Sequence, residues 1–157
     1  MRVLLRAPLL SLSGYGVHSR QVYQWLEKLP NIQLDVEILQ WGMTTWFVNP
    51  DELDGMVGRI MSKSKKIEKG YDLTFQLQLP DEWDPSLGKV NVGITAAVET
   101  TICSSKWIDA CNRMDAIIVP SEFTKSVLLR SGTLIKEVKV IPEWFNEKIN
   151  SPFNLKL

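Results

Sequence analysis

Stretches of apolar residues about as long as a β-strand alternate with helix-like segments along almost the whole chain. Strands are expected at residues 3–7, 34–40, 72–78, 90–98, 116–120 and 137–142. Helices are expected at about 17–29, 50–69, 105–114 and 122–131, and the proline-containing loop 79–89 has no helix of its own. This alternation predicts a single Rossmann-like α/β domain, in which helices cover both faces of a mostly parallel sheet. Ligands of such sheets bind at the carboxyl ends of the strands.

Local signals mark the ends of the second expected helix. Asn49 can cap it, Pro50 suits its first position, and Glu52 stands where a capping box needs an acidic residue. Gly70 offers a left-handed stop. These signals predict one long helix between residues 50 and 69.

Serines precede the last two expected helices. Ser104 or Ser105 can cap the first of them, and Ser121 can cap the second, with Glu122 favourably placed in its first turn. Three apolar residues of the second helix are expected to face inward: Phe123, Val127 and Leu128.

The composition narrows the class of protein. A length of 157 residues predicts one domain, which we place at residues 1–145, followed by a tail or interdomain linker at 146–157. Eighteen basic residues balance eighteen acidic ones, so no net charge would draw the chain to nucleic acid or to an anionic membrane. No apolar stretch is long enough to cross a bilayer. The two cysteines, Cys103 and Cys111, do not form a metal or disulfide pattern, and we expect a cytoplasmic protein without a metal site.

The loop after the first strand, "SLSGYGVHSRQV", is the first candidate site. Gly14 and Gly16 permit unusual backbone angles and close approach of a ligand, and the next helix would aim free N–H groups at an anion. The loop matches neither G-x-G-x-x-G, because Ser19 replaces the third glycine, nor the phosphate loop that ends in Gly-Lys-Ser/Thr. A plain turn between strand and helix is the alternative.

Three more positions could carry chemistry. His18, the only histidine, lies near the start of that first helix, where the neutral imidazole is favoured; a purely structural role is the alternative. Glu99 follows the fourth strand beside Thr100, and it could act as a general base, cap the next helix or pair with Lys106. Ser121 could bind a ligand at another strand end or serve only as a helix cap.

Two stretches together resemble a known family. "SGYGVHSRQV" resembles the glycine loop of GT-B-fold glycosyltransferases, and "VETTICSSKWIDACNRMDAIIVPSEFTKSVLLRSGTLIKEVKVIPEWFN" resembles an ordered run of motifs in the retaining family 4 group. The two matches cover the start and the last third of the chain, and the middle agrees only in its alternation of elements. The resemblance implies half of a GT-B fold, namely the N-terminal domain that binds the acceptor.

The resemblance also implies roles for individual residues. Gly14, Tyr15 and Gly16 would lie at the interdomain cleft near the donor phosphates, with the nucleotide-sugar as co-substrate and no other cofactor. Candidate catalytic residues are Glu99 and His18. Candidate substrate-binding residues are Ser13, Thr100 and Ser121.

The chain departs from the family pattern at three points. Trp144 stands where members usually have a glycine after the last Ile-Pro, and "TAAVE" lacks the histidine that many members carry at the end of the fourth strand. The chain also ends where the family's donor-binding domain should begin. We therefore expect sugar transfer to need a second domain, in cis or in trans, and the chain alone to be inactive or nearly so.

Two other functions compete with this one. A non-catalytic binding or assembly module on the same fold could use loop tryptophans as an apolar patch and could form a homo-oligomer; the candidates are Trp41, Trp46, Trp83 and Trp144. A small flavodoxin-like or nucleotide-binding protein is the third possibility, and the missing phosphate signatures weaken it.

Overall fold

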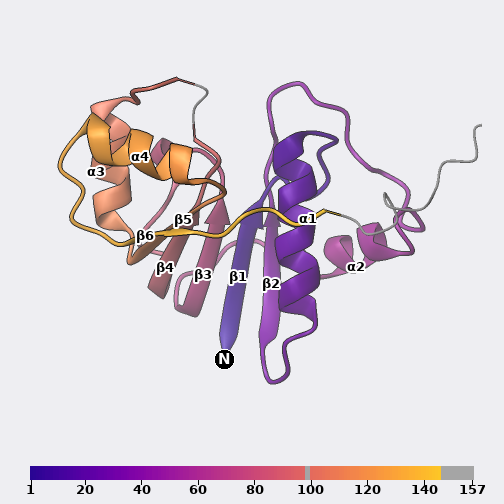
Figure 1. The fold of residues 1–157 in the computed structure, drawn as a ribbon. Coiled ribbons are helices and arrows are strands. Elements are labelled where there is room, and N and C mark those ends of the chain that lie inside the picture. The colour runs from indigo at the N-terminus through magenta and orange to yellow at the C-terminus, as the bar shows by residue number, and fades with distance from the viewer. Residues whose placement is uncertain (98–99, 146–157) are drawn as a thin grey trace, which may run out of the picture.

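A computed structural model describes residues 1–97 and 100–145 of the chain (Figure 1). Its strands are β1 Arg2–Ala7, β2 Gln33–Ile38, β3 Tyr71–Leu77, β4 Gly88–Ile94, β5 Ala116–Val119 and β6 Val138–Val140. Its helices are α1 Gly14–Glu27, α2 Met56–Ser62, α3 Ser105–Arg113 and α4 Glu122–Ser131, with a 3₁₀ turn, η1, at Pro80–Glu82. The tail that we expected at 146–157 lies outside the described residues.

Six strands form one parallel sheet in the order β2-β1-β3-β4-β5-β6, which confirms the Rossmann-like α/β fold. One row of paired residues crosses five of the strands, from Val36 through Leu5, Phe75 and Val92 to Ala116. These side chains share one face of the sheet, because paired residues in neighbouring strands point the same way.

The strand order reverses between β1 and β3. From β1 the chain moves outward to β2, then crosses back to β3 on the other side of β1 and continues outward to β6. In open α/β sheets, ligands bind beyond the carboxyl ends of the strands at such a reversal. The loops that follow β1 and its neighbours are therefore the part of the fold to inspect for a site.

Helices pack on both faces of the sheet, as the alternation predicts. Val22 and Leu26 of α1 and Ile60 of α2 share an apolar cluster with Val36 and Phe75. A second cluster joins α3 and α4 to the opposite face; it contains Ile108, Cys111, Val127, Leu128, Ile117, Val119 and Val138. In Figure 1, α1 and α2 lie at the β2 end of the sheet, while α3 and α4 lie toward the β6 end.

The second helix is much shorter than predicted. It spans Met56–Ser62 instead of residues 50–69, because Leu53, Asp54 and Gly55 all have positive φ angles, of 53°, 56° and 74°. Such angles do not occur inside a right-handed helix. Beyond the helix, Ser64 forms a parallel bridge with Val36, which draws the backbone toward the sheet edge.

The ends of other helices and strands differ from their predicted positions by a few residues. α1 begins at Gly14 rather than near Val17, because Ser13 caps it by accepting a hydrogen bond from the Gly16 N–H. The fourth strand ends at Ile94, four residues before its predicted end. The 3₁₀ turn η1 lies in the loop where no helix was expected.

The last two helices follow the sequence signals closely. Ser104, one of the two serines expected there, caps α3, and Ser121 caps α4, as predicted. Val127 and Leu128 are buried, but the prediction for Phe123 is wrong, because half of its surface is exposed. Phe123 lies in the first turn of α4, two residues after its cap at Ser121. No helix in the described residues is long and apolar enough to cross a membrane.

Candidate functional site

The loop after β1 is enclosed by the segment after β2. Leu9, Leu10 and Ser11 are buried, the Leu12 N–H donates to the Thr45 carbonyl, and the Phe47 N–H donates to the Leu10 carbonyl. These contacts hold the loop in one shape at the reversal point of the sheet.

The two glycines of the loop have different reasons to be glycine. A Cβ atom at Gly16 would lie 1.9 Å from the carbonyl oxygen of Ser11, so packing alone excludes any side chain there. No described atom would lie within 4 Å of a Cβ at Gly14. The fold therefore explains Gly16 as part of a turn, and Gly14 leaves open space beside the first N–H groups of α1.

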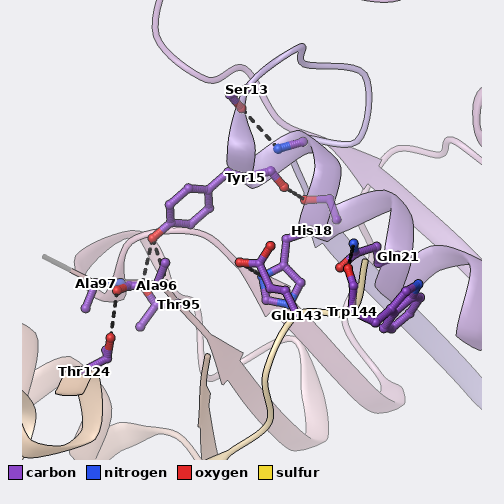
Figure 2. Close-up of polar contacts among 12 residues, drawn as sticks. Ser13, Tyr15, His18, Gln21, Thr95, Ala96, Ala97, Thr124, Glu143 and Trp144 are labelled. Carbon is purple, nitrogen blue, oxygen red and sulfur yellow. Dashed lines mark hydrogen bonds and ion pairs between the residues drawn. The ribbon is translucent and has the colours of Figure 1, made fainter. Parts of the chain in front are cut away.

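Tyr15 connects the loop to the far side of the reversal point (Figure 2). Its hydroxyl lies 3.1 Å from the Thr95 hydroxyl and accepts a hydrogen bond of 3.1 Å from the Ala96 N–H, just beyond the end of β4. Its ring stacks on Trp41 with the centroids 4.0 Å apart. Burial raises the pKa of the Tyr15 phenol above its ordinary value, which keeps the hydroxyl protonated and available as a donor.

The same polar chain continues to the start of α4. The Thr124 hydroxyl donates to the Ala96 carbonyl, at 3.3 Å, and lies 3.0 Å from the Ser121 hydroxyl. Ser121 also caps α4 by accepting from the Thr124 N–H. We call the chain from Tyr15 through Thr95, Ala96 and Thr124 to Ser121 the edge chain; it joins the opening loop, the end of β4 and the start of α4. Figure 2 shows its part from Tyr15 to Thr124.

His18 lies away from the edge chain. It is buried, and its Nδ1 lies 3.2 Å from Oε1 of Glu143, in the segment after β6 (Figure 2). Burial lowers the pKa of His18 below its ordinary value, although the Glu143 carboxylate opposes this effect. The imidazole is therefore neutral at pH 7, as its place near a helix start predicts.

Two further predicted residues, Thr100 and Ser13, have hydrogen-bond partners of their own. Glu99 lies outside the described residues. Thr100 is exposed, and its hydroxyl donates to the Ile102 carbonyl at 2.8 Å. Ser13 uses its hydroxyl to cap α1, at 3.1 Å from the Gly16 nitrogen, and to accept from Ser11.

Three residues of the site were not named in the sequence analysis: Thr95, Thr124 and Arg20. Tyr15 was assigned only by resemblance, and its link to Thr95 spans 80 positions of the chain, which no local pattern reveals. Arg20 is buried under the loop, where its guanidinium donates to the Leu9 and Ser11 carbonyls at 2.9 and 2.8 Å. Its spacing of three residues from the buried Tyr23 on α1 was the available signal. Burial lowers the pKa of Arg20, yet the group stays cationic beneath the loop.

The edge chain consists of hydroxyls and backbone groups that bond to one another, and its Tyr15 and Ser121 hydroxyls belong to partly exposed residues. No group of three His, Cys, Asp or Glu side chains within residues 1–97 and 100–145 could hold a metal ion. Cys103 and Cys111 are buried free thiols at the far end of the sheet. This set of groups suits hydrogen bonding to a polyhydroxylated or anionic ligand.

No protein-family model, no curated protein and no solved structure matches this chain in the three comparisons. The resemblance to GT-B glycosyltransferases rests on the sequence motifs themselves.

Proposed function

We propose that this chain is the acceptor-side domain of a GT-B-fold glycosyltransferase, which transfers a sugar from a nucleotide-sugar to an acceptor. The observation that carries the proposal is the edge chain. Its hydrogen bonds join the two separate stretches that resemble the family, one beginning at the glycine loop and the other running past Ser121, at the carboxyl edge of the sheet. A Rossmann-like fold with a parallel sheet is compatible with the same proposal.

Each part of the edge has a role in this proposal. Gly14 leaves space for a donor phosphate at the start of α1, where unpaired N–H groups and the helix dipole favour an anion. The Arg20 guanidinium, held beneath the loop between two carbonyls, adds positive charge on the same side. The half-buried Ser121 hydroxyl offers a hydrogen bond to an acceptor, while the buried Thr95 and Thr124 hydroxyls hold the edge chain together. A second domain, in cis or in trans, would bind most of the nucleotide.

The test compares a variant of the open glycine with a control in the same helix. Gly14→Val fills the space beside the first N–H groups of α1, whereas Gln24→Val places the same side chain at an exposed position farther along it. Nucleotide-sugars are titrated into the isotope-labelled chain by NMR, and transfer is assayed with a candidate second domain added. We expect shifts at the Gly14 and Tyr15 amides, which Gly14→Val abolishes and Gln24→Val leaves in place.

Two outcomes would contradict the proposal. Rapid sugar transfer by the isolated chain would show that it contains a whole active site. Amide shifts confined to residues away from the edge chain would show that the glycine loop is only a turn.

One observation favours the alternative, a non-catalytic binding or assembly module. Trp25 and Trp144 are each about half exposed, and both line the same face of the molecule beside α1. The four loop tryptophans named in the sequence analysis do not form one exposed patch, because Trp83 is buried and Trp41 stacks on Tyr15. Light scattering over a concentration series tests the alternative: self-association that Trp144→Ser abolishes would favour it.

A further inference from the structure

A cavity of about 240 Å³ lies under the segment that follows β6. This segment, residues 141–145, crosses the sheet toward α1 (Figure 1). Val22 and Trp25 of α1 form one wall, the strand residues Phe75, Ile94 and Ile118 form the floor, and Trp144 contributes to the roof. The cavity thus lies on the α1 side of the sheet, separate from the edge chain.

Hydrogen bonds hold the segment that forms the roof of the cavity at both of its ends. The Ile141 N–H donates to the Val119 carbonyl at 2.9 Å, where the segment leaves the sheet. At the other end, the Gln21 side-chain amide donates to the Trp144 carbonyl at 2.5 Å, and Glu143 lies beside His18 (Figure 2). Because hydrogen bonds hold residues 141–145 at both ends, the walls of the cavity are well defined.

The walls favour an aromatic occupant. Trp25 and Phe75 meet edge to face, with their ring centroids 5.7 Å apart, and aliphatic side chains complete the lining. An apolar cavity of about 150 Å³ is large enough for a single benzene ring and stays free of water. A cavity of 240 Å³ with such walls suits a molecule of two fused rings.

One end of the cavity carries two polar side chains, His18 and Glu143, which can form hydrogen bonds. The Glu143 carboxylate can only accept them, apart from its contact with His18. A carboxylate at one end of an otherwise apolar pocket favours a ligand that carries a hydrogen-bond donor.

From these observations we propose that the cavity is a binding site for a two-ring aromatic molecule that carries one N–H or O–H donor. The rings lie between Trp25, Phe75 and Ile118, and the donor points to Glu143. A concave apolar pocket with a few polar groups at one end is the usual form of a small-molecule site. The proposal does not depend on the glycosyltransferase assignment, because none of its residues belongs to the edge chain.

Indole is the probe, since it has two fused rings and one N–H donor. It is titrated into the full chain by calorimetry and by NMR of isoleucine methyl groups. We expect saturable one-to-one binding with methyl shifts at Ile94 and Ile118, and about fivefold weaker binding of 1-methylindole, which lacks the donor. Equal binding of the two compounds would overturn the role assigned to the polar end.

A matched pair of variants tests the position of the site. Ile118→Phe fills the cavity, and Ile135→Phe makes the same change at a side chain that is 75% exposed and outside the cavity. We expect Ile118→Phe to weaken indole binding at least about tenfold, a change of about 1.4 kcal/mol, and Ile135→Phe to leave it unchanged. Circular dichroism checks that both variants fold. Absence of saturable binding to the wild-type chain, or methyl shifts only elsewhere, would overturn the proposal without any variant.

Discussion

Replacement of Gly16 by alanine tests whether the opening loop owes its shape to packing. The new Cβ would lie 1.9 Å from the Ser11 carbonyl oxygen, and the two atoms must separate by about 1.5 Å to reach an ordinary contact. Ser11 is fully buried, so its backbone has no free space to enter. The same carbonyl accepts a hydrogen bond of 2.8 Å from Arg20, which a displacement of that size would break.

The expected loss of stability follows from these two effects. Overpacking of a buried site costs about 1–3 kcal/mol, and loss of a hydrogen bond from a charged donor costs about 1.5–3 kcal/mol. Alanine also lowers the conformational entropy of the unfolded chain, which offsets about 0.4–1 kcal/mol of this loss of stability. The free energy of unfolding should therefore fall by about 3 kcal/mol, which lowers the Tm of a domain of this size by about 6–12 °C.

Gly14→Ala is the matched control, two residues earlier in the first turn of α1. No described atom lies near its new methyl group, and Gly14 is already in the helix, so stability should change by less than about 1 kcal/mol and in the favourable direction. Urea denaturation followed by circular dichroism measures both variants. If Gly16→Ala were as stable as Gly14→Ala, the steric explanation for the second glycine would be refuted.

Three further outcomes are expected. Tyr15→Phe removes the hydroxyl that links the loop to Thr95 and Ala96, so it should lower the free energy of unfolding by about 1–2 kcal/mol and speed amide exchange at Ala96; unchanged exchange would argue against the link. Because burial lowers the pKa of His18, the unfolded chain binds its proton more readily, and stability should be complete above about pH 6.5 and decline as the pH falls further. Urea midpoints between pH 7.5 and 5.5 measure this decline, and a slope that persists in His18→Gln would contradict it. Burial raises the pKa of the Cys111 thiol to about 12, so a thiol reagent at pH 8 should modify it only after unfolding, and rapid modification of the native chain would be inconsistent with this burial.

Signals confined to a few neighbouring residues were the most reliable guides to the fold. The cap at Ser121 was predicted correctly, and the cap of α3 was narrowed to Ser104 or Ser105, because a serine hydroxyl satisfies N–H groups only two or three residues away. The long helix after Pro50 was predicted from equally clear local signals and was wrong. There, Leu53 and Asp54 adopt left-handed backbone angles that their residue types do not favour, and the bridge from Ser64 to Val36 shows that contact with the sheet takes precedence over local preference.

In the candidate site, too, the sequence predicted local features but not the contacts between distant residues. The sequence marked the opening loop, the end of the fourth strand and Ser121 as separate places, because each follows a strand. It could not reveal that Tyr15 reaches Thr95, 80 residues later, or that Arg20 lies under the loop with two carbonyls. The sequence also could not show that Gly16 must be a glycine while Gly14 need not be. That difference depends on the position of the Ser11 carbonyl, which only the tertiary structure gives.

The sequence by itself determined the class of this protein: alternating apolar strands and capped helices that form a Rossmann-like α/β domain. Those properties arise from periodicity and capping within a few residues of the chain. The tertiary structure alone decided the strand order, the edge chain and the cavity beneath residues 141–145. Each of these depends on which distant segments meet across the sheet, and burial and hydrogen bonding between segments far apart in sequence select that arrangement.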